Sequence, residues 1–318
     1  MREESIHAVL SHDYPQNWAE FLSWFGNNQA CAKYLETLRW PDGFVCPACT
    51  SKGAPYRASR ARLICHACRT QTSVTAGTIF DGTRTPLTTW FAAIWYVTTQ
   101  KNGVSALGLK RVLGLGSYQT AWTILHKLRR AMVRPGRERL SGTVEVDETY
   151  VGGEEEGVRG RQTETKAILA IAIELHEPKG YGRVRVRQIK DVSSASLILF
   201  IVDTVEPGST VNTDGWKGYN GLAKYGYTHQ KTVLSATGDP AHVAMPGVHR
   251  IASLLKRWLM GTHQGAVLPV HLDDYLDEYT FRFNRRSSKS RGLLFYRLLQ
   301  NAVVVRHTSF RAIVDCQR

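Results

Sequence analysis

Four of the chain's six cysteines form two closely spaced pairs, and this pattern constrains the fold of the first hundred residues more than any other feature. The pairs are Cys46-Pro47-Ala48-Cys49 and Cys65-His66-Ala67-Cys68, with fifteen residues between them. Two such knuckles supply four thiolates for one tetrahedral zinc ion, and because four sulfurs fill the coordination shell, the ion would be structural. We therefore predict a small zinc-stabilised β ribbon over residues 41–83, whose folding free energy comes mainly from the metal. A redox pair, or cysteines that occur there by chance, is the alternative.

The segments on either side of the ribbon predict helices. Residues 1–40 carry aromatic and apolar residues at helical spacing, and residues 84–135 contain an apolar helix, a short helix, a glycine turn and a longer helix that Ser117 would cap. A short helix, a turn and a helix with a basic flank is typical of a helix-turn-helix DNA reader. We predict DNA contacts from His126, Lys127 and Arg130. A plain helical bundle with a solvated basic face is the alternative.

The charge balance indicates a polyanionic partner. Lys and Arg number 41 against 27 Asp and Glu, and the sequence pI is about 9.6. No apolar run approaches the roughly 20 residues of a membrane span, and the N-terminus lacks a signal peptide pattern. We therefore expect a cytoplasmic, nucleoid-associated protein without a membrane partner. Disulfides are rare in that compartment, so Cys31 and Cys316 are interpreted as ordinary thiols.

Two later segments, Val144–Asp147 and Val211–Asp214, run β-branched residues into an aspartate. Further strands are predicted near 166–174 and 183–190, and a helix near 193–205. Two carboxylates delivered by strand ends can hold the divalent metals that assist an in-line phosphoryl displacement. A strand ending in a loop aspartate is the alternative for each segment taken singly.

Two stretches that follow these aspartates along the chain also bear on function. The run Gly215–Tyr219 interleaves aromatic residues with Lys217, a composition that suits a strand edge facing a phosphate backbone. We therefore add Lys217 to the predicted DNA contacts. The carboxylate run Glu154–Glu156 is interpreted as solvated and is given no catalytic role.

A late helix adds a third candidate contributor. After Pro246-Gly247, an apolar stripe of Ile251, Leu254, Leu255, Trp258 and Leu259 predicts an amphipathic helix. His249 and Lys256 are seven residues apart, so they lie two turns apart on one line, away from that stripe. A histidine in line with a lysine can serve as metal ligand, acid or base, or phosphate contact. A surface coincidence is the alternative.

Taken together, these motifs resemble the zinc-ribbon transposases of bacterial insertion sequences known as family 1595. The resemblance spans about residues 18 to 300 and rests on the two knuckles, the segment from Ser105 to Arg130, Val146–Gly153, Thr213–Tyr219, Leu255–Arg257 and Gly261–His263. It implies a multidomain α+β or α/β protein with a ribonuclease H-like mixed-sheet catalytic domain. By position, the resemblance makes Asp147, Asp214 and His249 the catalytic metal-binding residues and places Lys256 at the family's helix lysine.

The resemblance also implies a division of the chain and an activity. The expected segments are N-terminal helices (1–40), zinc ribbon (41–83), helix-turn-helix (84–135), catalytic domain (140–300) and C-terminal tail (301–318). The expected activity is binding of terminal inverted repeats and metal-dependent cleavage and strand transfer of double-stranded DNA, with structural Zn²⁺ and catalytic Mg²⁺ or Mn²⁺. Because such reactions pair two DNA ends, the resemblance implies a homo-oligomer on DNA.

The third metal position departs from the superfamily, which commonly has glutamate where this chain has His249. Imidazole is a poorer ligand than carboxylate for Mg²⁺, and a neighbour such as Glu148 is the alternative third ligand. Two other functions remain open. One is a catalytically inactive or domesticated DNA-binding protein, and the other is a plain metal-dependent endonuclease.

Overall fold

The computed structural model describes residues 12–59, 61–134, 136–153, 166–176, 178, 180–232 and 244–315. Cys316, the run Glu154–Glu156 and the beginning of the predicted N-terminal segment lie outside these residues. The chain forms two compact units, which we call the helical unit (Met1–Arg134 with Ser288–Arg318) and the sheet unit (Pro135–Ser287). This division differs from the predicted one, in which the catalytic domain extended to residue 300.

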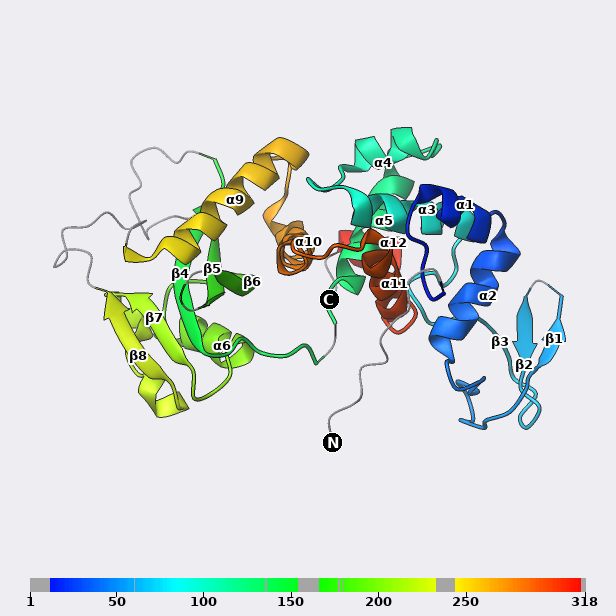
Figure 1. The fold of residues 1–318 in the computed structure, drawn as a ribbon, viewed down its shortest axis with the longest axis horizontal. Helices are drawn as coiled ribbons and strands as arrows, with labels where there is room; N and C mark the ends of the chain where they lie inside the picture. Colours follow the sequence, from blue (N-terminus) through cyan, green and yellow to red (C-terminus); the bar gives the residue numbers. More distant parts are fainter. Residues whose placement is uncertain are drawn as a thin grey trace. The chain divides into compact units, whose positions relative to one another are not determined.

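The helical unit contains a three-stranded antiparallel ribbon and helices from both parts of the sequence (Figure 1). Its elements are α1 (Trp18–Trp24), α2 (Asn28–Arg39), β1 (Tyr56–Ala58), β2 (Arg62–Ile64), β3 (Gln71–Ser73), α3 (Leu87–Thr99), α4 (Ala106–Val112), α5 (Tyr118–Ala131), α11 (Arg291–Ala302) and α12 (Phe310–Val314). The predicted cap is present, because the Ser117 side chain accepts a hydrogen bond from the backbone N–H of Thr120.

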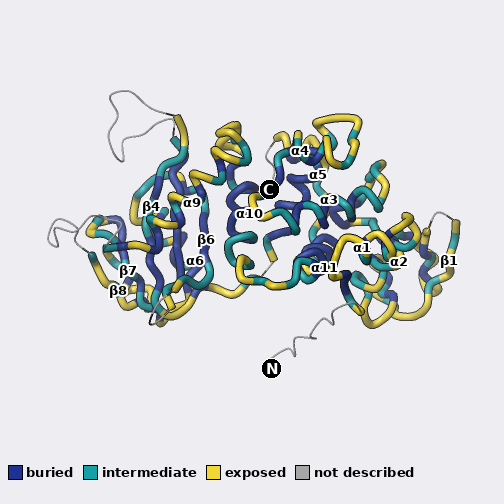
Figure 2. The backbone as a smooth tube through the Cα atoms, turned by 45° about the horizontal axis from the view of Figure 1, so that its top comes forward, coloured by how far each residue is buried: buried dark blue, intermediate teal, exposed yellow. Residues whose placement is uncertain are grey.

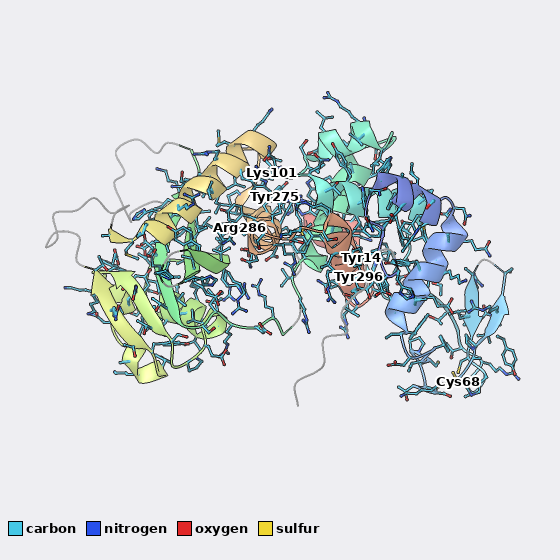
Figure 3. All side chains as sticks on the ribbon, in the orientation of Figure 1. Tyr14, Cys68, Lys101, Tyr275, Arg286 and Tyr296 are labelled. Carbon is cyan, nitrogen blue, oxygen red and sulfur yellow. The ribbon has the colours of Figure 1, made fainter. Side chains whose placement is uncertain are left out.

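Helix α11 belongs to the helical unit because its aromatic side chains complete that unit's core. The fully buried ring of Phe295 lies 5.5 to 5.8 Å, between ring centroids, from four aromatic rings of α1, α3 and the α1–α2 turn. Figure 3 shows Tyr296 beside Tyr14, with their ring centroids 6.0 Å apart. A Cβ added at Gly292 would stand 1.8 Å from the carbonyl oxygen of Pro15, so only glycine permits this approach. The predicted boundary at residue 300 therefore cuts through a core helix of the other unit.

The sheet unit is built on a mixed five-stranded sheet in the order β6-β5-β4-β7-β8. Its elements are β4 (Thr143–Val151), β5 (Ala167–Leu175), β6 (Tyr181–Ile189), α6 (Ser194–Thr204), β7 (Thr210–Asp214), η1 (Lys217–Tyr219), η2 (Leu222–Tyr225), β8 (Thr228–Thr232), α9 (Pro246–His263), η3 (Pro269–His271) and α10 (Leu272–Asn284). Strands β4, β5 and β6 pair antiparallel, and β4–β7 and β7–β8 pair parallel. This arrangement is compatible with the ribonuclease H-like domain that the sequence predicted.

Helices cover both faces of this sheet. Helix α6 packs on one face with alternate residues of β4 and β5, and α9 and α10 pack on the other face with the intervening residues of β5 and with β6. Strand β5 is therefore buried on both sides, as Figure 2 shows for the inner strands. Within the described residues, no helix has the length and apolar composition needed to cross a membrane.

Candidate metal centres and catalytic site

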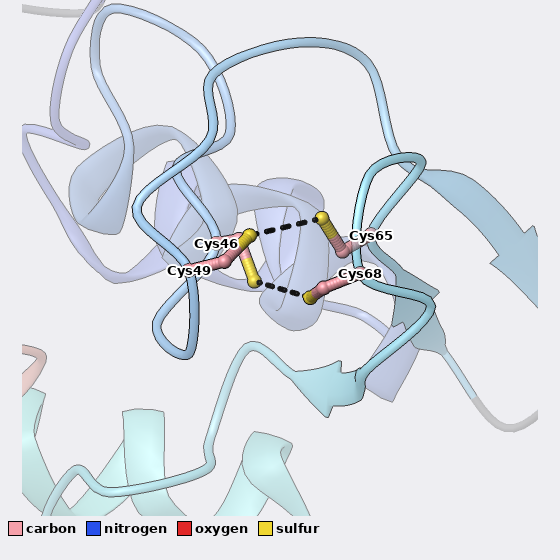
Figure 4. A group of neighbouring side chains, drawn as sticks. All are labelled: Cys46, Cys49, Cys65 and Cys68. Atoms are coloured by element: carbon pink, nitrogen blue, oxygen red, sulfur yellow. Dashed lines mark hydrogen bonds between the residues drawn. The ribbon is translucent and has the colours of Figure 1, made fainter.

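The four paired cysteines of the ribbon come together in one cluster (Figure 4). The Sγ atoms of Cys46 and Cys68 are 3.6 Å apart, and those of Cys49 and Cys65 are 3.7 Å apart. A tetrahedral zinc ion with Zn–S bonds of about 2.3 Å requires sulfur–sulfur distances of about 3.8 Å. The cluster therefore fits a structural zinc ion, as the sequence predicted.

The two knuckles have the same backbone turn, so each presents its pair of thiols in the same way. Each ends in a residue with a left-handed backbone, Thr50 (φ 59°) and Arg69 (φ 60°). Their N–H groups donate to the carbonyl oxygens of Cys46 (2.9 Å) and Cys65 (3.1 Å). Such a conformation costs a non-glycine residue roughly 1–2 kcal/mol. Zinc binding would offset that cost, since its free energy is also folding free energy in small zinc modules.

We expect the purified protein to carry one zinc per chain and Cys46→Ser to lose it. The hydrophobic core of the ribbon is small, and structural zinc contributes roughly 10–16 kcal/mol of apparent binding free energy in zinc-finger peptides. Elemental analysis and hydrogen exchange of residues 44–73 measure both effects. Cys31→Ala, which changes a buried thiol outside the cluster, is the control and should keep its zinc. Folded protein whose four cluster thiols all react freely would contradict this.

The second candidate site lies in the sheet unit, where two carboxylates occupy adjacent strands. The parallel pairing of β4 with β7 ends where Glu145 is matched with Asn212, and Asp147 and Asp214 each lie two residues further along their own strand, on the same face as that last pair. Asp147 faces α9, because its antiparallel neighbour on β5 belongs to the core under that helix. Helix α9 brings His249, whose Nε2 atom is 4.0 Å from Oδ2 of Asp147. The structure thus places His249 next to Asp147, and Asp214 at the end of the neighbouring strand β7.

The donor atoms of this site suit a divalent cation of the Mg²⁺ or Mn²⁺ type. Asp147 and Asp214 offer carboxylate oxygens, and Oδ1 of Asn212 is buried on the same face with no hydrogen-bond partner among the described residues. Among the described residues, the candidate ligand atoms of Asp147, Asp214 and His249 do not all lie within 4.8 Å of one another.

Glu148 lies on the opposite face of the sheet from Asp147. Its neighbour across β5 is Ala170, which packs under α6. The hydroxyl of the fully buried Tyr219 donates to Oε2 of Glu148 at 2.9 Å. Burial, and then the charges of Glu148, Asp147 and Asp214, raise the pKa of Tyr219 well above its ordinary value. The phenol therefore stays protonated and keeps Glu148 as its acceptor.

The turn after Asp214 is fixed by Trp216. Its backbone N–H donates to Oδ1 of Asp214 at 2.9 Å, and its indole N–H donates to the carbonyl oxygen of Val192 at 2.9 Å. Trp216 and Tyr219 pack with the core under α6, so the prediction that these aromatics face a phosphate backbone is wrong. Burying a large ring releases more free energy than leaving it at a wet edge. Lys217, between them, is exposed.

Lys256 is exposed on α9, two turns beyond His249, as its spacing predicted. Partial burial and the nearby charge of Lys166 lower the pKa of its ammonium group. Lys166 comes just before β5, next to the end of β4, so two cationic side chains approach one another at that end of the sheet. The sequence did not single out Lys166, because one cation before a strand has no distinctive pattern.

The predicted DNA-contact residues of α5 are mostly buried. His126 and Lys127 are inaccessible to solvent or nearly so, and Arg130 is half-buried. The Nζ atom of Lys127 donates to the carbonyl oxygen of Ile79 at 3.1 Å, and burial lowers the pKa of this lysine. The prediction that His126 and Lys127 lie on an outer face is therefore wrong. The buried side of α5 is wider than the apolar stripe because it includes the stem and amine of a lysine.

A cysteine ribbon, together with a mixed sheet that carries two aspartates under a helix with a histidine and a lysine, is compatible with the transposases, a class of DNA-processing proteins. The family model of the ISXO2-like transposase domain matches residues 139–284, and that of the transposase zinc-ribbon domain matches residues 26–71. Both models describe the IS1595 group, and the chain belongs to this family of insertion-sequence transposases. Both domains imply DNA as the partner.

A curated relative agrees with this assignment. The chain is 26% identical over 280 residues to an uncharacterized protein in the transposable element ISH50 of Halobacterium salinarum. The match covers 81% of this chain and 91% of the relative. The similarity therefore extends well beyond the sheet unit alone.

Proposed function

We propose that this protein cuts DNA at the ends of an insertion sequence and joins those ends to target DNA. The proposal is supported by Asp147 and Asp214 lying on adjacent parallel strands, and by helix α9, which bears His249 and Lys256, bringing Nε2 of His249 to 4.0 Å from Oδ2 of Asp147. We interpret the sheet unit as a ribonuclease H-like catalytic domain. The same proposal includes binding of the element's terminal repeats, binding of target DNA and assembly of a homo-oligomer on DNA.

Two displacements at phosphorus make up the reaction. In the first, a water molecule loses a proton to solvent and its oxygen bonds to the phosphorus at the element's end, while the P–O3′ bond breaks and the 3′ oxygen takes up a proton to leave as a free hydroxyl. In the second, that hydroxyl loses its proton to solvent, its oxygen bonds to a target phosphorus, and the target's own 3′ oxygen leaves and takes up a proton from solvent. Divalent cations, when bound, supply Lewis-acid stabilisation of the attacking and leaving oxygens.

The chain's residues have separate roles in this scheme. Asp147, Asp214 and His249 would hold the cations, and Lys256 would bind a phosphate next to the cut. Glu148 is less suited as the third ligand, because Tyr219 holds it from the other face of the sheet. Imidazole favours softer first-row metals over Mg²⁺, so this site should prefer Mn²⁺.

DNA reading is better placed at the beginning of α5 than at its middle. Ser117, Tyr118 and Gln119 are exposed there, and Arg111, at the end of α4, is exposed across the turn. In a helix-turn-helix, the first residues of the second helix contact base edges and flanking cations contact phosphates. We therefore propose Gln119 and Arg111 as DNA contacts in place of the buried Lys127.

We expect Gln119→Ala and Arg111→Ala to weaken binding to the element's ends in different ways. Losing a base contact at Gln119 should cost about 1–3 kcal/mol at one base pair, and losing a phosphate contact at Arg111 should reduce the salt slope by about 1. Binding titrations at several salt concentrations measure both effects. Lys127→Ala is the comparison: it should lower the melting temperature and leave the salt slope unchanged. A reduced slope for Lys127→Ala alone would return DNA binding to the middle of α5.

A joining assay tests the proposed activity directly. Element ends already cut to expose the 3′-hydroxyl are incubated with the protein, Mn²⁺ or Mg²⁺ and a target plasmid. Joined products support a transposase. Cleavage of uncut ends without joining would indicate a plain endonuclease, and binding without either reaction would indicate a DNA-binding protein derived from a transposase.

A further inference from the structure

We propose that Glu145 is a positioning residue of the catalytic site, whose carboxylate anchors the beginning of α9 and so sets the position of His249 relative to Asp147. The proposal rests on the proposed function, since it takes His249 as a metal-binding residue. Neither the zinc ribbon nor the DNA-reading helices take part in it.

Glu145 is buried beneath the helix end. Its side chain is 3% exposed, and it precedes Asp147 by two residues on β4, so both carboxylates lie on the face that α9 covers. Oε2 of Glu145 accepts a hydrogen bond from the backbone N–H of Val248 at 3.0 Å, and the N–H of Gly247 bonds to the same carboxylate. One strand therefore supplies both a metal ligand and the anchor of the opposing helix.

This carboxylate takes the place of an ordinary helix cap. The residue before α9, Met245, makes no side-chain capping bond, and Pro246 at the first helical position has no N–H to satisfy. The first available donors of the helix are those of Gly247 and Val248, and both point to Glu145. A negative charge at a helix N-terminus is also favoured by the aligned peptide dipoles.

Gly247 allows the helix end to approach this closely. A Cβ at this position would stand 2.7 Å from Oε2 of Glu145, closer than real Cβ contacts, and 3.1 Å from Cγ2 of Ile173, tighter than most of them. A side chain here would therefore displace the Glu145 carboxylate from the helix end or push the first turn of α9 away from the sheet. His249 lies in that turn, with its Nε2 atom 4.0 Å from Asp147, so a shift of the turn moves the third ligand away from the first.

A buried carboxylate can also be purely structural, and Glu174 offers the matched control. It is 6% exposed on the neighbouring strand β5, and it accepts hydrogen bonds from the backbone N–H groups of Ser141 (3.0 Å) and Arg183 (2.7 Å). Its neighbour on β4 is Val144, so it faces away from α9. Loss of Glu174 tests what a buried carboxylate contributes to folding without moving His249.

The experiment compares full-length Glu145→Ala, Glu145→Gln and Glu174→Ala. Cleavage of end DNA is measured across Mn²⁺ concentrations, and hydrogen exchange is measured at residues 247–251. We expect Glu145→Ala to accelerate exchange at these residues. We also expect it either to raise the half-saturating Mn²⁺ concentration or to lower kcat by about 10- to 100-fold, the usual effect of losing a residue that orients a metal ligand. Glu145→Gln should recover most of this, because its amide oxygen still accepts the Val248 N–H.

The outcomes separate this inference from the proposed function. Glu174→Ala should keep the parent's Mn²⁺ requirement. An equal change of Mn²⁺ requirement or kcat in Glu145→Ala and Glu174→Ala would overturn the positioning role. Unchanged hydrogen exchange at residues 247–251 in Glu145→Ala would overturn it as well. His249→Ala tests the proposed function by itself, and if it remains active the third-ligand assignment fails while the exchange result still decides the anchor. If Glu145→Ala does not fold, Gly247→Ala must give the same shifts, and parent-like behaviour of that variant would overturn the proposal.

Discussion

Asp147→Asn and Asp214→Asn are each expected to abolish DNA cleavage and joining while leaving binding to the element's ends largely intact. Each change removes a metal-binding charge and keeps the shape of the side chain. Metal catalysis contributes several kcal/mol to such reactions, and at about 1.4 kcal/mol per tenfold in rate the loss should reach at least about a thousandfold. The two residues lie on different strands, β4 and β7, so each would hold metal from its own position and neither should replace the other.

Single-turnover cleavage and joining of end DNA, with binding measured in parallel, gives the result. Asp203→Asn is the matched control, because Asp203 lies on α6 of the same unit and pairs with Arg187 at 2.8 Å on the outer surface. It should cut and join like the parent. In the same assay, His249→Glu should exceed His249→Ala with Mg²⁺, since hard cations prefer oxygen. Activity in both aspartate variants would end the interpretation of this protein as an enzyme.

Deletion of residues 288–318 is expected to unfold the helical unit and leave the sheet unit folded. The deletion removes α11, whose Phe295 is enclosed by four aromatic rings of that unit. Truncating one buried Phe to Ala costs about 3–5 kcal/mol, and a whole domain has only about 5–15 kcal/mol of stability. The free energy lost with the entire helix should therefore exceed the free energy of unfolding of the helical unit.

Hydrogen exchange resolved by segment, together with a DNA-binding titration, tests this result. Residues 87–131 should lose protection and end binding should disappear, while strands β4 to β6 keep their protection. Phe295→Ala should weaken the helical unit in the same direction, and Val304→Ala, at a position 65% exposed, should not. A deleted chain that still binds end DNA like the parent would show that α11 is dispensable.

Local patterns predicted the parts of this protein whose geometry is set by short stretches of sequence. Knuckle spacing identified the cysteine cluster, and β-branched runs into Asp147 and Asp214 identified two strands that turned out to be neighbours. Helical spacing aligned His249 with Lys256. Strand β8 was missed, because its residues Thr228–Thr232 are polar and lie at the sheet's edge, where no apolar alternation is required.

Long-range contacts account for the remaining differences. The partner of Lys127 is a carbonyl oxygen 48 residues earlier in the chain, and helical periodicity gives the direction of a side chain without its depth. Membership of α11 in the helical unit depends on Gly292 meeting the backbone at Pro15, a contact with no local signal. The alternation of side chains along a strand could have placed Glu145 on the same face as Asp147. Its contact with α9 could not be predicted, because its hydrogen-bond partner Val248 lies 103 residues later in the chain.

The division of the helical unit between two stretches of sequence has a consequence for the order of events during synthesis. Residues 135–287 leave the ribosome as one uninterrupted stretch, so the sheet unit can fold as soon as it is made. The helical unit must wait for Phe295 to emerge. Under the proposed function, a nascent chain therefore has its proposed metal ligands in place before the unit proposed to read DNA is complete, and a polypeptide released early should not bind the element's ends.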